Sequence, residues 1–355
     1  MSGQSRIAVT LLVVISAFVL NVQLAQAQDD VVAAGITPSA VVGEAAKATP
    51  PVTVPTGPTT AEGPTAQRLS LALGGDYRYH GRNYVLPRAL VELKGKVKTY
   101  VAGQTLAVTI KRGKRVVLRK DVSFEKLHDA GVFTLKFRAG ASGSYSFHVE
   151  HLDSAELTLS STHSVKLKVV STDISRGSRG VSVQLIQQKL AALKFVVPRS
   201  GKFDDATGRA LLAFRKTNGL SRIERAGYRV GKKLALGQGA FKLKYPKAGR
   251  HVEVDLSRQV MAFADNGKVE RVYHVSSGKP STPTVQGTFH FYLKSWGTNQ
   301  KGMVNSSYFI RGYAVHGYSS VPNYAASHGC IRVPVPNAAS IFRWIRSGDR
   351  IDVYR

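Results

Sequence analysis

The chain contains a single cysteine, Cys330, within the run Ser-His-Gly-Cys-Ile-Arg. One thiol cannot form a disulfide within its own chain, so Cys330 is either an inert buried side chain or a reactive group. A thiolate is a strong nucleophile and forms within reach of neutral pH, because a free thiol has a pKa of about 8.5. The adjacent histidine, glycine and arginine, together with His316 upstream, favour the reactive alternative. We therefore predict nucleophilic catalysis at Cys330.

Acyl transfer by a thiol also needs a group that moves the proton and hydrogen-bond donors for the tetrahedral oxyanion. His316 is the predicted base, which could hold the thiolate as an ion pair and return the proton to the leaving amine. We expect His328 to orient the loop or His316, and backbone N–H groups near Gly329 to serve the oxyanion. Arg332 either binds a substrate carboxylate or has a structural role, as an ion pair or through hydrogen bonds to the loop backbone. The remaining predicted substrate-binding positions are Ser327 and Gly317.

A zinc site is the rival interpretation of histidines near a cysteine. Zinc usually takes three or four protein ligands. Only His316, His328 and Cys330 are available here, and a single cysteine cannot make a Cys-x-x-Cys pair. We therefore expect neither a metal nor another cofactor.

The first residues have the order typical of a secretory signal peptide. Arg6 precedes an apolar stretch at residues 7–22, and a small-x-small cleavage site follows at residues 25–27. An uncleaved membrane anchor is the alternative, although the apolar stretch is short for a spanning helix. We predict removal of residues 1–27, a location in the cell wall or cell envelope, and no membrane span in the mature chain.

Positive charge is concentrated in the middle of this 355-residue chain, whose net charge is +28. Residues 67–248 carry +23, against −2 for residues 1–66 and +7 for residues 249–355. Such a surplus attracts polyanions. Export argues against nucleic acid, so anionic cell-wall polymers are the predicted partners. Charge that serves only solubility is the alternative.

The length suits two to four domains. Residues 28–66 contain six prolines and no aromatic residue, which predicts an extended linker. Residues 67–172 contain short, often alternating apolar segments separated by Gly-rich turns. This pattern predicts an immunoglobulin-like β-sandwich, with a spacer as its default role.

Residues 176–225 change to helical periodicity, with Asp204 placed to cap a second helix. The spaced positions are Gly180, Val183, Ile186, Gln187 and Leu190, then Gly201, Phe203, Asp204 and Thr207, then Phe214, Gly219 and Leu220. Together they resemble the small three-helix peptidoglycan-binding module, although Arg215 stands where that family usually has glutamine. The resemblance implies wall binding, and a helical linker without a ligand is the alternative. Residues 226–248 are predicted to be a linker.

Residues 249–355 return to strands joined by tight turns, with a strong hairpin signal at Asn266-Gly267 and one late helix at residues 337–346. Six segments stand out, at residues 255–259, 276–278, 282–283, 287–289, 315–317 and 327–332. The last two read Val-His-Gly and Ser-His-Gly-Cys-Ile-Arg. Together the segments resemble the L,D-transpeptidase catalytic domain. The whole chain is thus predicted to be multidomain and mainly β.

This resemblance implies that Cys330 attacks the carbonyl before the terminal D-alanine of a peptidoglycan stem peptide. The acyl group would pass to a diamino acid on another stem, giving a 3→3 cross-link, and carbapenem-type β-lactams would acylate the same thiol. An L,D-carboxypeptidase or other cysteine hydrolase would use the same residues with water as acceptor. A non-catalytic wall-binding protein is the remaining alternative, and the intact motifs argue against it.

Overall fold

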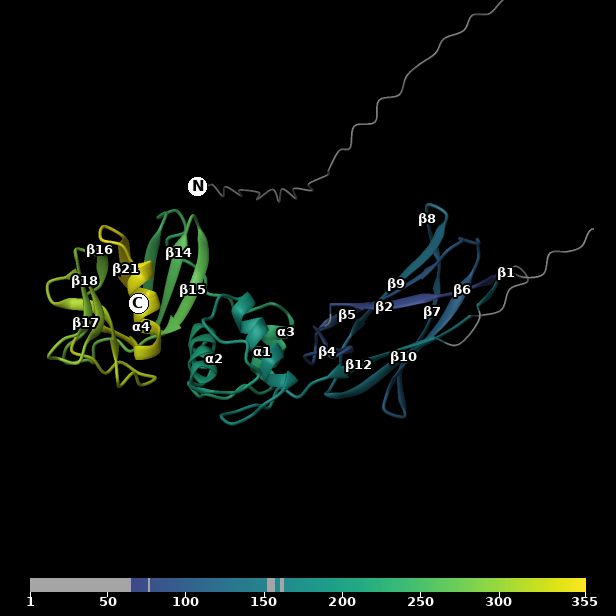
Figure 1. Ribbon diagram of the computed structural model, residues 1–355, viewed down its shortest axis with the longest axis horizontal. Coiled ribbons are helices and arrows are strands. Elements are labelled where there is room, and N and C mark those ends of the chain that lie inside the picture. Colours follow the sequence, from purple (N-terminus) through teal and green to yellow (C-terminus); the bar gives the residue numbers. More distant parts are fainter. Residues whose placement is uncertain (1–64, 76, 152–156, 160–162) are drawn as a thin grey trace, which may run out of the picture. The chain divides into compact units, whose positions relative to one another are not determined.

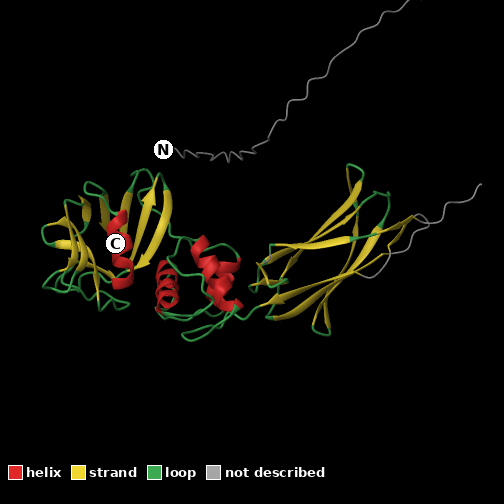
Figure 2. Cartoon of the chain, in the orientation of Figure 1, coloured by secondary structure: helices red, strands yellow, loops and turns green. Residues whose placement is uncertain are grey.

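The computed structural model describes residues 65–75, 77–151, 157–159 and 163–355. The predicted signal peptide, residues 1–27, lies outside the described residues, and so does the predicted linker up to residue 64. The described part is mainly β (Figure 1; Figure 2), which confirms the predicted fold class. None of its four helices is long and apolar enough to cross a membrane.

The first folded region is a β-sandwich. Its strands are β1 (Thr65–Gln67), β2 (Ser70–Gly74), β3 (Tyr77–Tyr79), β4 (Arg82–Val85), β5 (Leu90–Val97), β6 (Thr105–Arg112), β7 (Arg115–Ser123), β8 (Glu125–Leu127), β9 (Ala130–Arg138), β10 (Gly143–His151), β11 (Leu157–Leu159) and β12 (His163–Val169). One sheet has the order β3-β4-β12-β10-β6-β7, the facing sheet has the order β2-β5-β9-β8, and β1 pairs with β11 in a separate two-stranded sheet. Alternate residues of β5 and β6 are buried, as the period of a strand requires. Leu93, Leu106 and Phe147 lie in the shared core.

Three helices follow, α1 (Val181–Ala192), α2 (Asp205–Thr217) and α3 (Tyr228–Ala235). Asp204 caps α2 as predicted, since its carboxylate accepts the backbone N–H of Thr207 at 2.8 Å. The predicted linker at residues 226–248 is wrong at α3. That helix buries only Val230, Gly231 and Leu234. Three of its eight residues are basic, so the short apolar stripe is difficult to recognise in the sequence. The stripe completes the core of the three helices.

The C-terminal region contains two sheets. Strands β13 (His251–Asp255), β14 (Val260–Asp265), β15 (Lys268–His274), β16 (Gly287–His290) and β21 (Arg350–Tyr354) form one, in the order β15-β14-β13-β21-β16. Strands β17 (Leu293–Thr298), β18 (Val304–Ile310), β19 (Tyr313–Tyr318) and β20 (Ile331–Pro334) form the other, in chain order. Helix α4 (Val335–Trp344) packs with both in a core that includes Phe263, Phe309 and Val333.

The turns of this region follow local chemistry. Asn266 and Gly267 both have positive φ, 47° and 73°, as the predicted hairpin turn requires. The apolar run at residues 308–315 is divided between two strands. Arg311 adopts φ 48° there, and the chain reverses between β18 and β19. Helix α4 begins at Val335, two residues earlier than predicted, because a proline is tolerated in the first turn of a helix.

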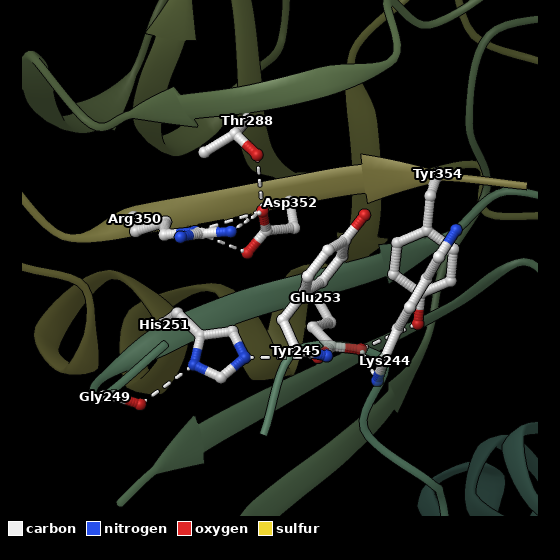
Figure 3. A network of polar contacts seen from close by, with 9 residues as sticks. All are labelled: Lys244, Tyr245, Gly249, His251, Glu253, Thr288, Arg350, Asp352 and Tyr354. Carbon is white, nitrogen blue, oxygen red and sulfur yellow. Dashed lines mark hydrogen bonds and ion pairs between the residues drawn. The ribbon is translucent and has the colours of Figure 1, made fainter. Parts of the chain in front are cut away.

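A buried network of polar side chains joins β13 to β21 (Figure 3). The fully buried Glu253 carboxylate accepts the backbone N–H groups of Lys244 and Tyr245 and the hydroxyl of Tyr354, at 2.7–2.9 Å. His251 Nε2 lies 3.2 Å from the same carboxylate. Burial alone disfavours both charges, but these hydrogen bonds outweigh it, so the pKa of Glu253 is lowered and that of His251 is raised. The pair is therefore ionic inside the fold.

Candidate active site

The predicted base and nucleophile lie on neighbouring strands. Strand β19 carries His316, and β20 pairs with it in parallel, so that His316 is opposite Arg332. Cys330 immediately precedes β20. Parallel neighbours need a crossover connection, and residues 319–330 supply it here. The pairing therefore brings residues fourteen positions apart in sequence to one edge of the sheet.

His316 is held in one tautomer. Its side chain is 3% exposed, and Nδ1–H donates to the carbonyl of Gly317 at 2.9 Å. The ring meets Tyr318 edge to face at 5.7 Å between centroids. Burial lowers the pKa of His316, and the charge of Arg332 lowers it further, so the ring is neutral near pH 7. Nε2 makes no hydrogen bond within the described residues and can accept a proton.

Cys330 is half-buried, and its thiol donates a long contact of 3.7 Å to the carbonyl of Gly312. Burial raises the pKa of the Cys330 thiol, although the backbone of Ala314 and the charge of Arg332 partly offset the rise. In the described residues no hydrogen bond joins Cys330 to His316. Thiol and imidazole are therefore both neutral at rest, whereas the sequence predicted an ion pair. This arrangement suits proton transfer during attack on a substrate.

Hydrogen bonds fix the loop that presents the thiol. Ser327 Oγ donates to the carbonyl of Cys330 at 2.6 Å and accepts the N–H of Gly329 at 3.1 Å. Thr284 Oγ1 donates to the carbonyl of Gly329 at 2.8 Å. Gly329 has φ 114°, and a Cβ there would lie 1.8 Å from the ring of Tyr313. Only glycine fits this position without rearrangement.

These contacts bear on two predicted roles. The N–H of Gly329 is already bonded to Ser327, which leaves the N–H of Cys330 as the better oxyanion donor on this loop. Ser327 is buried, and both hydrogen bonds of its hydroxyl stay within the loop. Gly317 is buried as well, and a Cβ there would lie 2.7 Å from Ala338. The contacts of Ser327 and Gly317 thus hold the site together.

The side chains of Arg332 and His328 lie in different surroundings. The guanidinium of Arg332 lies over the ring of Tyr318, 4.1 Å from its centroid, and the Arg332 backbone pairs in both directions with Ser276. His328 is exposed, with Nε2 3.5 Å from the amine of Lys279. No hydrogen bond in the described part of the chain joins His328 to Cys330 or His316. Of the predicted site residues, His316 and Arg332 are opposite each other in the β19–β20 pair, and Cys330 immediately precedes β20.

Three supporting residues were missed as site residues by the sequence reasoning. Thr284 bonds the nucleophile loop, Tyr313 packs against Gly329, and Gln259 exchanges hydrogen bonds with Ser277. Gln259 and Ser277 lie inside two of the segments quoted for the resemblance, so a signal existed for them. Thr284 follows the Thr-Pro segment directly, which is a weaker signal. Within the described ranges, no three His, Cys, Asp or Glu side chains gather as metal ligands would.

Comparison with known proteins identifies a family for the C-terminal region. Residues 249–353 match the YkuD family model, described as the L,D-transpeptidase catalytic domain. A crystal structure of the L,D-transpeptidase (residues 123–326) from Xylanimonas cellulosilytica is 30% identical, with 52% of this chain and 98% of that chain covered and a TM-score of 0.48. An L,D-transpeptidase from Stackebrandtia nassauensis is 22% identical, covering 52% and 96%, with a TM-score of 0.33. The Enterococcus faecium catalytic domain acylated by ertapenem is 28% identical, covering 30% and 97%, with a TM-score of 0.26.

No curated protein matches the chain. The family model nevertheless matches residues 249–353, and the chain covers 98% of a 30% identical L,D-transpeptidase. The chain belongs to the L,D-transpeptidase catalytic domain family through residues 249–353. Both candidate reactive residues, His316 and Cys330, lie inside that range.

Proposed function

We propose that this protein is an exported peptidoglycan L,D-transpeptidase that forms 3→3 cross-links through an acyl-enzyme at Cys330. The observation that supports this most is a lone thiol beside a strand whose neutral imidazole keeps Nε2 free, inside a matched L,D-transpeptidase domain. Members of the family act on cell-wall peptidoglycan. The substrate class assigned here is therefore the stem peptide.

In the first step, Cys330 Sγ attacks the carbonyl carbon before the terminal D-alanine. The thiol proton passes to His316 Nε2 as the carbon–sulfur bond forms. The carbon–nitrogen bond then breaks, and the imidazolium returns the proton to the leaving amine of D-alanine. The N–H of Cys330 stabilises the oxyanion of the tetrahedral intermediate.

In the second step, the side-chain amine of a diamino acid on another stem attacks the thioester. His316 Nε2 takes the proton of that amine, the carbon–sulfur bond breaks, and the leaving thiolate takes the proton from the imidazolium. Arg332 and His328 are placed at the edges of this site. We assign Arg332 to a substrate carboxylate, with Tyr318 holding its guanidinium, and His328 to orientation of the loop.

Upstream, we propose a signal peptide at residues 1–27, a linker up to about residue 66, a spacer sandwich over residues 67–172 and a helical module from residue 176. The +23 charge of residues 67–248 would attract anionic wall polymers, and the helices would add specific wall contacts. Retention of the Cys330→Ala protein on isolated cell walls should then weaken as salt rises, because screening shortens from about 8 Å at 0.15 M to about 3 Å at 1 M. Equal retention at both salt concentrations would exclude charge as the anchor.

The reaction is tested by incubating the full chain with purified tetrapeptide stems and measuring the products by mass spectrometry. A cross-linked dimer is expected. Free tripeptide without dimer would instead identify an L,D-carboxypeptidase, and unchanged substrate would identify a wall-binding protein. Cys330→Ala should abolish turnover and leave thermal unfolding unchanged, because the substitution removes a small loop side chain. Turnover by that variant would exclude the covalent mechanism.

A second measurement uses a carbapenem with the same pair of proteins. The thioester chemistry proposed for the substrate predicts a covalent adduct on the wild-type chain and none on Cys330→Ala, measured as intact mass. An unmodified wild-type chain after prolonged incubation would count against Cys330 as an accessible nucleophile.

A further inference from the structure

The crossover between β19 and Cys330 is held from outside the matched catalytic region. Arg222 follows α2, and its Nη1 donates to the carbonyl of Asn323 at 2.9 Å, while its Nη2 donates to the carbonyl of Ser257 at 2.9 Å. The side-chain amide of Asn323 donates back to the carbonyl of Arg222 at 2.9 Å. This reciprocal pair fixes Asn323, which lies within the crossover, against residues that are not part of the 249–353 match.

A second contact reaches the same crossover through the protein interior. Lys216, in α2, is 2% exposed, and its amine lies within 3.3 Å of the carbonyls of Gln259 and Val275 and 2.7 Å from His274 Nδ1. His274 is 3% exposed, and its Nε2 lies 3.0 Å from the carbonyl of Val321. Burial lowers the pKa of His274 to about 3, so the ring is neutral. It accepts at Nδ1 from Lys216 and donates from Nε2–H to Val321.

These two anchors are continuous with the reactive loop. Ser276 Oγ donates to the carbonyl of Tyr324 at 2.6 Å, and the N–H groups of Ala326 and Ser327 both donate to the carbonyl of Ser277. The segment between Val321 and Ser327 is thus bonded along its length. It connects the strand of the base directly to the loop of the nucleophile.

The contacts of Lys216 differ from an exposed ion pair on the protein surface. Lys216 has no carboxylate partner among the described residues, and all of its acceptors are carbonyls and an imidazole of the catalytic region. A buried amine is costly unless every hydrogen bond is made. By contrast, Arg225, on the same segment as Arg222, is exposed and pairs with Asp173.

We propose that Lys216 and Arg222 are positioning residues for the active site, through which the helical module holds the crossover that sets His316 and Cys330 relative to each other. This role rests on the proposed function only in the use of Cys330 as the reacting group. The helices would then act on the chemistry as well as on wall binding.

The test uses full-length Arg222→Ala, with Arg225→Ala as the matched control and Arg222→Lys as the conservative variant. The first readout is the rate at which a carbapenem acylates Cys330, followed by intact mass. Arg222→Ala should react on the order of tenfold more slowly, because small displacements of reacting groups cost large factors in rate. Arg222→Lys should be intermediate, and Arg225→Ala should equal the wild type.

The second readout is hydrogen–deuterium exchange of the peptide covering residues 319–330, which needs no activity. Faster exchange confined to this peptide is expected for Arg222→Ala and not for Arg225→Ala. Wild-type rates of acylation and exchange in Arg222→Ala would overturn the positioning role. If the wild type itself is not acylated, the proposed function fails, and the exchange result still decides the positioning role.

Two further variants cover the case in which Arg222→Ala does not fold. Asn323→Ala removes one side chain of the reciprocal pair and should slow acylation about threefold, the effect of a single hydrogen bond. Lys216→Met keeps the length of the side chain and removes its donors, and should slow acylation at unchanged apparent affinity for the carbapenem. Wild-type behaviour of both variants would overturn the inference.

Discussion

Two groups of buried polar side chains lie in the same catalytic domain, one around Glu253 and one around Cys330, and they differ in how completely their atoms are paired. Each oxygen of Glu253 accepts two hydrogen bonds, and His251 uses both ring nitrogens. At the other site, within the described residues, the Cys330 thiol donates only a long contact of 3.7 Å and His316 Nε2 makes no hydrogen bond.

The pKa directions follow from this difference. Around Glu253, hydrogen bonds overcome the cost of burial and keep both groups charged. Around Cys330, burial prevails over the weaker compensation and keeps both groups neutral. A fully paired network stabilises the fold, whereas an incompletely paired one leaves a thiol and a base ready for a substrate.

The largest expected effect separates the two histidines by function. His316→Ala should lower kcat by about 10²–10⁴-fold, the usual contribution of a general base, with little change in substrate affinity or melting temperature. Steady-state kinetics on stem peptides measures this, with the exposed strand residue His290→Ala as control. If His328→Ala is the more damaging substitution and His316→Ala is nearly silent, the two histidine roles are reversed.

Substitutions in the network around Glu253 should instead affect the stability of the fold. Glu253→Gln should lower the free energy of unfolding by about 3–5 kcal/mol, because it leaves His251 buried without its counter-charge. Tyr354→Phe removes only one of the four hydrogen bonds and should cost about 1–3 kcal/mol. Urea unfolding of both variants measures the difference. Equal stability of Glu253→Gln and the wild type would mean that the network does not stabilise the fold.

The Glu253–His251 pair should stabilise the fold most within a limited pH range. The stability from Glu253 is present above its unfolded pKa of 4.5 and is lost as pH falls through the lowered folded value. The stability from His251 is present below its unfolded pKa of 6.5 and is lost as pH rises through the raised folded value. The stability difference between wild type and Glu253→Gln should therefore be largest between pH 4.5 and 6.5. A difference that is flat from pH 4 to 9 would contradict the ionic assignment.

The smallest expected effect sharpens the description of the active site. Because the pKa of Cys330 is raised from 9.0, its alkylation by iodoacetamide should keep accelerating as pH rises past that value. Arg332→Gln removes a charge that lowers the pKa values of both Cys330 and His316. In the pH–rate profile for turnover, the acidic limb set by His316 and the basic limb set by Cys330 should then both move to higher pH. A plateau near pH 7 in the wild type would instead indicate a preformed thiolate–imidazolium pair.

The sequence predicted those features that local chemistry determines. Asp204 caps its helix, Asn266-Gly267 forms its turn, and the two motifs lie on neighbouring strands. Alternation misleads at Glu253, because a charged residue between valines normally faces solvent. Here Tyr354 and the segment at residues 244–245 cover that face of the strand.

The supporting contacts of the site could not be predicted from the sequence, because they also depend on how distant segments pack together. Thr284 and Arg222 contact the reactive loop and its crossover only after segments far apart in sequence have packed together. Neither residue has a local pattern that marks it. Helix α3 was missed because only two of its apolar side chains, Val230 and Leu234, are buried, and the rest of the segment resembles a basic linker.

The parallel pairing of β13 with β21 joins residues 251–255 to residues 350–354, about one hundred positions later. Closing so long a loop is entropically unfavourable, and contacts of such high sequence separation slow folding. Strand β13 also lacks one of its two neighbours in the sheet until β21 has been synthesised. A chain that still ends before residue 350 carries His316 and Cys330 without the sheet that completes their domain. The order of synthesis thus delays assembly of the catalytic domain until β21 has been made.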